Sequence, residues 1–466
     1  MGEEQAATAD LSRDFADFVA NAQYMELPPD AIDGAKKSIL DTVGVTLAAS
    51  GMEPAARGFI DLVREMGGRA ESSIIGFDAN VPAAMAAFAN GTLAHALDFD
   101  DQTPWGAHPD SSLVPAALAV AQRKGSVSGK QLITAVAIGQ DLFVRLRCNV
   151  GWRQDWNLST VVGAFSACAS AAHVLALRPQ QVAHALGLAS MQSCGTMETI
   201  FGIGGDMRGL YAGFTAKGAV LAALLAQKGV TGIARVFEGP DGIVNTYFGG
   251  KYDREKIVHG LGKEFAGGAM IYKYWPAVGN VHTYLHAIIE LMKEHRLVAN
   301  DIGEIRAYVG DFSQRMCLPL DARRAPATLL DAKFSLPFCV ALAATHARLK
   351  ISDFTTDSLK DPKVLALARK VVPVADASLD WKMKLPDGRI EVETLDGRVF
   401  ERTGKNVPGS PEAPMTWDQL TDKFRDCAAC AATPLPKDNV ERALSIARNL
   451  ESCGDAGELL SALNAR

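Results

Sequence analysis

The sequence predicts a mainly α-helical protein with a large all-α helical domain and a smaller α/β (α+β) domain. Apolar residues follow the helical period from Leu11 to about Met270, where Ala, Leu and Gly predominate. After Met270, short alternating or β-branched runs typical of strands interrupt this pattern. A chain of 466 residues, 48% of them apolar, is also too long for one compact unit, so two domains are expected.

Several apolar stretches in the first half are expected to be helices. They cover residues 82–97, 111–122, 132–150 and 161–177. The last stretch ends before Arg178-Pro179, where a helix should stop because Pro restricts the residue that precedes it. Its many alanines let helices approach closely, so we interpret the Ala/Gly richness of residues 160–230 as packing.

The smaller domain is expected to combine strands with a helix. Strand-like runs are EIRAYVGDF (304–312), SLDWKMKL (378–385), RIEVETL (389–395) and RVFERT (398–403), while SLPFCVALAATHARL (335–349) is typical of a helix. Asp387-Gly388 and Asp396-Gly397 predict hairpin turns. Past the loop VPGSPEAPMTW the chain returns to helix. We therefore place the all-α domain at residues 1–268 and 406–466 and the α/β domain at 269–405.

Composition narrows the possible partners. The net charge is −6, charged residues make up 21% of the chain, and no block of like charges occurs, so we expect neither a nucleic-acid nor a membrane partner. No uninterrupted apolar run reaches the roughly 18 residues that a membrane span needs. The first twenty residues carry acids instead of a basic region before an apolar run, so no signal peptide is expected and the cytoplasm is the expected location.

Eight scattered cysteines predict buried thiols and no disulfide framework. Cys427 and Cys430 form a lone C-x-x-C motif. It could be a redox pair or half of a zinc site, but no second pair exists and this spacing simply places both residues on one helix face.

The densest polar cluster is AHALDFDDQTPWGAHPDSS, in which His95, Asp98, Asp100, Asp101 and His108 lie where one apolar helix ends and another begins. Acids and imidazoles at such a junction can line a cleft and orient each other. A metal site is the alternative, but the spacing matches no metal motif, and we expect none. A further alternative is that some of these residues, above all Asp110, cap helix ends.

These strings resemble the MmgE/PrpD family, which includes 2-methylcitrate dehydratase, cis-aconitate decarboxylase and iminodisuccinate epimerase. HALDFDD and AHPDSSLVPAALA resemble its signature region, and further similar strings follow in order, among them GLYAGFTAKGAVLAALLAQKGVTG, YKYWPAVGNVHTYLHA, DAKFSLPFCVALA and KNVPGSPEAPMTWDQLTDKF. The resemblance covers almost the whole chain. It implies an all-α domain built from both chain ends, a smaller α/β domain, a homodimer and a cleft between the domains that needs no cofactor.

The resemblance also implies a set of site residues. Asp98, His108 and Lys273 match family positions with catalytic roles, and His282 matches a further site position. Gln102, in the same polar cluster, is a candidate for substrate binding.

Three family positions depart from the pattern. Asn157 stands where many members have His, Arg208 aligns with a Lys, and Phe338 aligns with a Tyr. Asn157 can donate a hydrogen bond but cannot shuttle a proton, and Arg208 can grip a carboxylate but stays protonated. Both remain candidates for substrate binding in a pocket tuned to another substrate or outcome.

Proton removal next to a carboxylate needs cationic groups for the developing charge and a base whose pKa lies near 7. His108 is the candidate base, Asp98 would orient and support it, and Lys273 and Arg208 could supply charge. The favoured function is a lyase acting on a small di- or tricarboxylic acid. An epimerase, or a relative that kept the fold and lost activity, stays open. His282 is alternatively a core histidine, and Lys273 a surface charge.

Two other motifs carry weaker signals. GIGGDMRG lacks a preceding strand and a complete phosphate-binding pattern, so we expect a flexible lid or tight turn beside Arg208 instead of a nucleotide site. Arg145 and Arg147 lie two residues apart on a helix, so at most one of them reaches a cleft.

Overall fold

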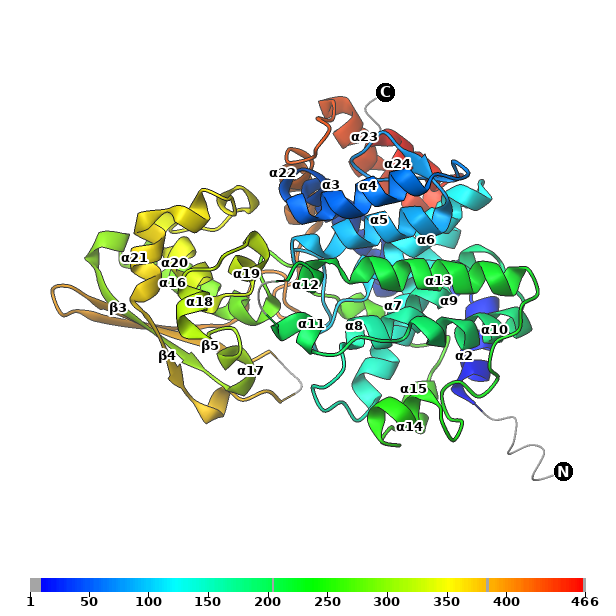
Figure 1. Ribbon diagram of the computed structural model, residues 1–466, viewed down its shortest axis with the longest axis horizontal. Helices are drawn as coiled ribbons and strands as arrows, with labels where there is room; N and C mark the ends of the chain where they lie inside the picture. The colour runs from blue at the N-terminus through cyan, green and yellow to red at the C-terminus, as the bar shows by residue number, and fades with distance from the viewer. Residues whose placement is uncertain (1–9, 203–204, 383–384, 464–466) are drawn as a thin grey trace.

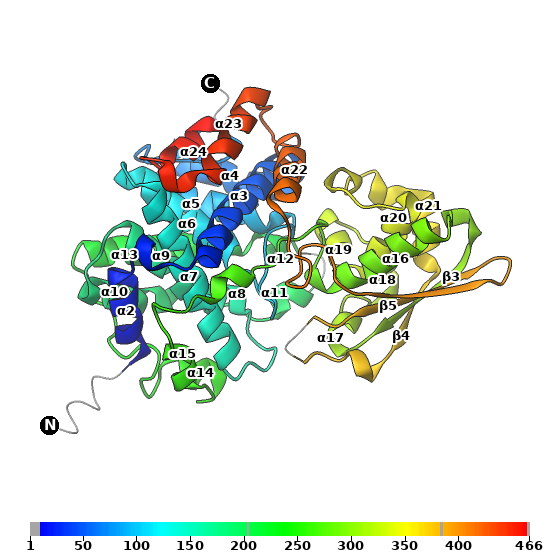
Figure 2. The same ribbon diagram turned by 180° about the vertical axis from the view of Figure 1, so that it is seen from behind.

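Two units lie side by side in the computed structural model, which describes residues 10–202, 205–382 and 385–463 (Figures 1 and 2). The large unit comprises helices α2–α15 and α22–α24. The small unit comprises α16–α21 and strands β3–β6. The helices of the large unit are α2 (Leu11–Asn21), α3 (Pro29–Met52), α4 (Pro54–Met66), α5 (Ala83–Ala96), α6 (Asp110–Lys124), α7 (Gly129–Asn149), α8 (Leu158–Val161), α9 (Gly163–Val174), α10 (Pro179–Ala189), α11 (Glu198–Phe201), α12 (Met207–Leu210), α13 (Ala212–Gln227), α14 (Ile243–Phe248), α15 (Arg254–Val258), α22 (Trp417–Ala428), α23 (Lys437–Arg448) and α24 (Gly457–Ala462). A short pair of strands, β1 (Ser72–Ser73) and β2 (Asn80–Val81), completes the large unit.

The Ala-rich helices α5, α6, α9 and α13 pack together in the core of the large unit, to which α3, α7 and α10 also contribute. The four predicted helical stretches are confirmed. Close approach explains their small residues. A Cβ on Gly91 of α5 would lie 3.0 Å from the Cα of Gly213 in α13, and a Cβ on Gly213 would lie 2.1 Å from Thr92 Oγ1. A larger residue at either position would push the two helices apart.

One helical stretch, Met207–Gln227, has the length and mean hydropathy of a membrane span, although no uninterrupted apolar run does. Within its most apolar window, 72% of the residues are buried inside the protein. That burial is typical of a core helix.

The C-terminal helices pack against the start of the chain, so the red and blue segments lie together in both ribbon views (Figures 1 and 2). Trp417 Nε1 donates to Asp33 Oδ1 at 2.7 Å, and Lys423 Nζ lies 2.7 Å from Asp41 Oδ1. These contacts agree with a large unit assembled from both chain ends, while the domain boundaries at 268/269 and 405/406 stay a prediction.

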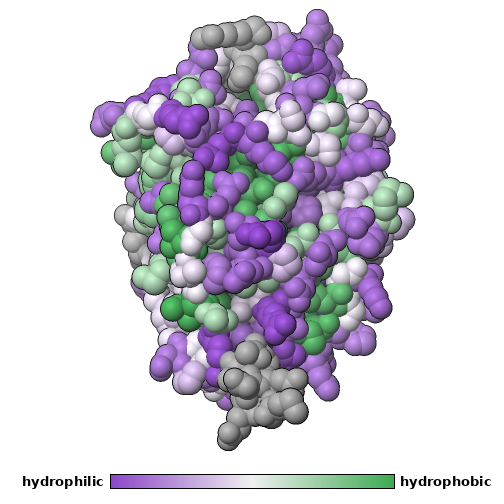
Figure 3. Space-filling model, turned by 90° about the vertical axis from the view of Figure 1, so that its right-hand side faces the viewer, coloured by the Kyte–Doolittle hydropathy of each residue, from purple (hydrophilic) through white to green (hydrophobic). Residues whose placement is uncertain are grey.

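Apolar patches lie among predominantly hydrophilic residues on the end of the large unit that faces away from the small unit (Figure 3). Within this unit, α13 exposes Phe214, Leu221 and Leu225 by about two fifths each. The expected homodimer stays a prediction that such surfaces are compatible with.

The small unit is built on a four-stranded sheet with the order β4-β3-β5-β6. β3 pairs with β4 in parallel and with β5 antiparallel, and β5 pairs antiparallel with β6. The buried side chains of β3 and β5 alternate along the strands and face α16 and α20. The elements are α16 (His282–Glu294), β3 (Ile302–Val309), α17 (Asp311–Gln314), α18 (Leu320–Arg324), α19 (Leu329–Lys333), α20 (Leu336–His346), α21 (Pro362–Arg369), β4 (Val371–Ala375), β5 (Gly388–Thr394) and β6 (Val399–Gly404).

Two predictions in this unit were wrong. SLDWKMKL was predicted to be a strand, but its described part contains the end of a short 3₁₀ turn, Ala377–Leu379, followed by irregular chain. The sheet takes its fourth strand from β4 instead. β4 contains Pro373, which a sheet accepts there because β4 is an edge strand. Gly388 begins β5 and does not turn between two strands, while the predicted hairpin at Asp396-Gly397 is confirmed between β5 and β6.

Candidate active site

The predicted polar cluster begins with His95 in the last turn of α5 and continues through the loop between α5 and α6. Asp98 follows the end of α5 in a left-handed backbone conformation, with φ at 49°, which short polar residues tolerate. Gly106 and Ala107 also have positive φ values, 78° and 76°, and turn the chain just before α6. This loop folds back on itself, so that acids from its start and His108 from its end meet.

His108 is held by contacts on both its backbone and its ring. Its backbone N–H donates to Ser159 Oγ at 2.9 Å, and its ring Nδ1 donates to the Asp101 carbonyl at 2.6 Å. Nε2 therefore carries the lone pair of the neutral ring, and it lies 3.9 Å from Asp98 Oδ1. Burial, assisted by the charge of Lys273, lowers the pKa of His108 to about 4, so the ring is neutral near pH 7.

A second imidazole, His95, lies beside His108 with ring centroids 4.7 Å apart. Its Nδ1 lies 2.9 and 3.0 Å from the two carboxylate oxygens of Asp100. Burial opposes ionisation of Asp100, but the neighbouring His95 and His108 outweigh it and hold the pKa of this carboxyl well below its usual range. The His95 ring also contacts Tyr211, at 4.6 Å between centroids.

Lys273 forms an ion pair with Asp98 behind His108. Lys273 Nζ donates to Asp98 Oδ1 at 2.5 Å and to the Asp98 carbonyl at 2.9 Å, and both side chains are fully buried. Lys423 Nζ supports the same region by donating to the backbone carbonyls of Lys273 and Phe99. Lys273, Asp98 and Lys423 are therefore each satisfied by a group of opposite charge or by backbone carbonyls.

Asp101 and Asp110 form a buried pair of acids on the far side of the loop. Burial and mutual repulsion raise the pKa of Asp101 well above its usual value, and burial raises the pKa of Asp110 to about 6. Asp110 is not the N-cap of α6. It lies in the first turn of that helix, and its Oδ2 accepts a hydrogen bond from Gln140 Nε2 at 2.7 Å.

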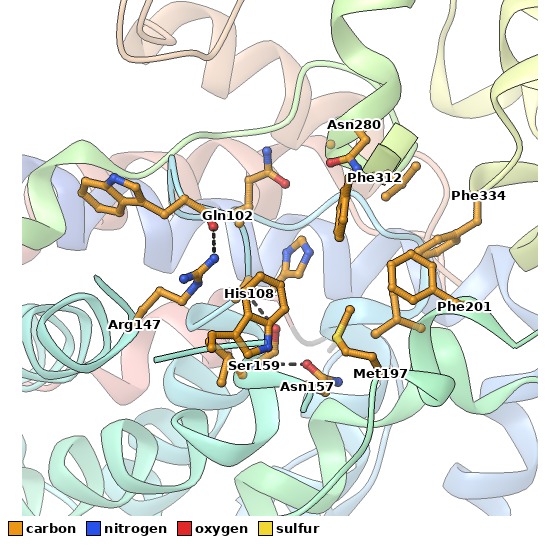
Figure 4. A pocket seen from close by; sticks show the side chains of 18 of the residues that line it. Gln102, His108, Arg147, Asn157, Ser159, Met197, Phe201, Asn280, Phe312 and Phe334 are labelled. Atoms are coloured by element: carbon orange, nitrogen blue, oxygen red, sulfur yellow. Dashed lines mark hydrogen bonds between the residues drawn. The ribbon is translucent and has the colours of Figure 1, made fainter. Parts of the chain in front are cut away.

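A pocket opens between the two units in front of His108, with an empty volume of about 700 Å³ that includes solvent at its mouth. Its polar lining includes His95, Gln102, His108, Arg147, Asn157, Ser159, Tyr211 and Asn280. In Figure 4, Arg147 lies to the left and Phe201 and Phe334 to the right, with His108 between them.

Family models match both parts of the chain. The MmgE/PrpD N-terminal domain matches residues 13–255, and the MmgE/PrpD C-terminal domain matches residues 275–452. The chain belongs to the MmgE/PrpD family.

The relatives are similar to this chain over most of their length. A cis-aconitate decarboxylase-like protein of Aspergillus oryzae is 25% identical, covering 97% of this chain and 97% of the relative. Human cis-aconitate decarboxylase is 24% identical over 97% of this chain and 94% of its own length. The mitochondrial 2-methylcitrate dehydratase of Yarrowia lipolytica is 24% identical over 86% of this chain and 80% of its length.

Of the predicted site residues, His108, Asn157 and Gln102 line the pocket. Asn157 also caps α8, since its side chain accepts from the Ser159 backbone N–H at 3.1 Å. Asp98 and Lys273 are brought together behind His108 and are not among the described lining residues.

The remaining predicted residues lie outside the pocket lining. Arg208 Nη1 lies 3.4 Å from Asp331, its Nη2 donates to the Gly202 carbonyl, and its guanidinium stacks on Phe334 at 4.6 Å. Burial lowers the pKa of Arg208 to about 10, which leaves it charged at pH 7. Phe338 is buried in the core of the small unit. The predicted lid or turn at GIGGDMRG includes residues 203–204, which lie outside the described residues.

His282 faces a neighbouring cavity that shares Gln102, Trp105 and Gly279 with the pocket. Its Nε2 donates to the Ala277 carbonyl at 3.0 Å, and burial lowers its pKa to about 3. These contacts suit a neutral, structurally held histidine.

Sequence reasoning missed several lining residues. Arg147 lines the pocket, whereas Arg145 pairs with Asp141 at 2.7 Å, in agreement with the prediction that at most one of the two reaches a cleft. Their spacing could not decide which. No sequence signal marks Tyr211 or Asn280, because a single Tyr or Asn in an apolar helix or loop is commonplace.

Four residues of the cluster could hold a cation by distance alone, because one ligand atom each from His95, Asp98, Asp100 and His108 lies within 4.8 Å of the others. These atoms already serve other partners. Lys273 supplies a positive charge 2.5 Å from Asp98, and Asp100 is bonded by His95. A metal-free site therefore stays the prediction.

Proposed function

We propose that the chain is a lyase that removes the proton from a carbon next to a carboxylate, with His108 Nε2 as the base. The observation that carries the proposal is the state of His108. Its Nδ1 is committed to the Asp101 carbonyl, the ring is neutral near pH 7, and it lines the pocket. The relatives support a lyase, because their names describe loss of carbon dioxide or of water from a carboxylic acid.

In the proposed first step the C–H bond breaks, its proton passes to Nε2, and its electron pair spreads onto the carboxylate oxygens. Asp98, 3.9 Å from Nε2, stabilises the imidazolium that forms. In a dehydration the electron pair then forms the C=C bond and expels the hydroxyl of the adjacent carbon, which takes the proton from the His108 imidazolium and leaves as water. Lys273 acts through Asp98 in this arrangement as a positioning residue, because it does not reach the pocket.

The geometry favours a lyase over an epimerase. An epimerase needs proton-transfer groups on opposite faces of one carbon. The two imidazoles of the pocket are adjacent, with centroids 4.7 Å apart, and Lys273 is fully buried. The same proposal includes four further properties. The enzyme works without a cofactor, takes a small carboxylic acid as its substrate, forms a homodimer and is located in the cytoplasm.

The test is incubation in deuterated water with 2-methylcitrate, cis-aconitate, iminodisuccinate and a 3-hydroxy acid that has one carboxylate, followed by proton NMR. New alkene signals indicate dehydration, and loss of a carboxylate indicates decarboxylation. Deuterium uptake with a changed optical rotation but an unchanged chemical composition of the acid indicates epimerisation and contradicts the proposed lyase activity. Absence of any product or exchange with all four acids removes proton abstraction altogether.

A further inference from the structure

The charge of the pocket lining is low for a polycarboxylate. Among the described residues that line it, Arg147 is the single Arg or Lys, and there is no Asp or Glu. Arg147 is itself buried: its Nη2 donates to the Trp105 carbonyl, and its guanidinium lies 4.7 Å from the centroid of the Trp152 ring. Burial lowers the pKa of Arg147 to about 10, so it stays charged near pH 7. A citrate-like acid brings two or three negative charges, and each needs a partner once it leaves water.

The two nearby cations implied by sequence are committed elsewhere. Lys273 is fully buried against Asp98, and Arg208 lies behind Phe334 with Asp331 beside it. Neither belongs to the pocket lining. One carboxylate is therefore the charge that the lining can match.

Aromatic rings from both units form the end of the pocket opposite Arg147. Phe201 of α11 packs edge-on against Phe312 of α17 with centroids 5.5 Å apart, and Phe312 lies 5.3 Å from Trp381. All three line the pocket, together with Phe334, and all but Phe334 are partly exposed. Rings that line a cavity in this way suit an apolar ligand, which gains by removing their faces from water.

Buried donors without acceptors lie among these rings. Asn280 is 7% exposed, and its Nδ2 has no hydrogen-bond acceptor among the described residues. The indole N–H of Trp381 is likewise buried without an acceptor in that part of the chain. Buried donors of this kind usually find a partner, which here a ligand oxygen would provide.

We infer that the substrate carries one carboxylate and an aromatic or similarly bulky apolar group. The carboxylate lies toward Arg147, the reacting carbon at His108, and the apolar group against Phe201, Phe312 and Trp381. This substrate class rests on the proposed function, because it takes the pocket in front of His108 as the reaction site.

The experiment measures binding by calorimetry with three probes that separate charge from apolar bulk. They are 3-phenylpropanoate, butanoate and propane-1,2,3-tricarboxylate. We expect 3-phenylpropanoate to bind about tenfold or more tightly than either of the others. Phe201→Ala should weaken 3-phenylpropanoate by about threefold or more and leave butanoate unchanged. Tyr274→Ala, an exposed aromatic outside this pocket, is the matched control.

Tighter binding of the tricarboxylate, no measurable binding of 3-phenylpropanoate, or indifference of its affinity to Phe201→Ala overturns the inference. Thermal unfolding of both variants separates a lost contact from a lost fold. The outcome is independent of turnover. If 3-phenylpropanoate binds as expected but no acid exchanges deuterium, the substrate class stands and the proposed reaction fails. If only tricarboxylates exchange deuterium, the proposed reaction stands and the substrate class fails.

Discussion

The two ends of the pocket differ in how their side chains are fixed. At the polar end His108 and the residues behind it are tied by hydrogen bonds and ion pairs, including the 2.5 Å contact between Lys273 and Asp98. At the aromatic end Phe201 packs against the Phe312 ring and the Arg315 guanidinium, and Phe312 packs against Trp381.

This difference separates reaction from recognition. A base needs a fixed position and protonation state, which buried polar contacts supply. An apolar end needs only shape and surface, and it can be rebuilt by exchanging one ring for another without disturbing the base. We therefore expect substitutions at the polar end to remove the reaction and those at the aromatic end to change the substrate.

The largest expected effect is that of His108→Asn. Asn keeps a polar group of similar reach but cannot accept a proton, so deuterium exchange should fall by about 10²- to 10⁴-fold. The measurement is the NMR exchange assay with the best acid of the panel. His259→Asn, at an exposed histidine, should keep full activity. A His108→Asn protein that exchanges at the original rate would remove His108 as the base.

Lys273→Met should be the most destabilising change at the polar end. It leaves the fully buried Asp98 without its counter-charge, which costs about 3–5 kcal/mol of unfolding free energy. Urea unfolding measures the loss. The double variant Asp98→Asn/Lys273→Met should recover much of it, because no unpaired charge then remains. If the single variant is as stable as the original protein, Lys273 is not needed to neutralise the buried charge of Asp98.

The polar end was also the part that sequence could predict. The residues of this cluster come from the last turn of α5 and the loop that follows it, so a local pattern of residue types reveals them: His95, Asp98, Asp100, Asp101 and His108. The contact of Lys273 with Asp98 was not local, and the family resemblance pointed to both residues without showing that they form a pair.

The aromatic end could not be predicted, because its rings come from α11, α17 and the loop after β4. Taken singly, Phe201 or Phe312 looks like any core residue. The fold class could be predicted from the hydrophobic periodicity. Strand β4 was not predicted, because it has five residues and contains Pro373. Periodicity reports which face of an element is buried, and a site between two units depends on how those elements meet.

The pH dependence of the reaction tests whether the His108 ring is as buried as the structure shows. Since the pKa of His108 is about 4, kcat/KM should stay level as pH falls from 7 and decline only near pH 4. A decline centred near the ordinary histidine value of about 6.5 would show that the ring is better solvated than described.

The same shift affects stability. Between about pH 6.5 and 4 the unfolded chain binds a proton at His108 that the folded protein does not, so this residue lowers the unfolding free energy as pH falls through that window. Comparing the original protein with His108→Asn by urea unfolding at pH 7 and pH 5 isolates this contribution. The variant should lose less stability on acidification.

The smallest expected effect is that of Phe312→Leu at the aromatic end. Leucine keeps apolar surface but loses the ring contacts with Phe201 and Trp381, which are worth about 0.5–1.5 kcal/mol each. We expect a comparably small loss of unfolding free energy and weaker binding of 3-phenylpropanoate. The exchange rate at saturation with a short-chain acid should stay unchanged, because the ring partners of Phe312 are Phe201 and Trp381, whereas His108 is held by Ser159 and Asp101. A variant that lost exchange with every acid would instead show that the two ends of the pocket are coupled, and that the aromatic rings help to place the reacting carbon.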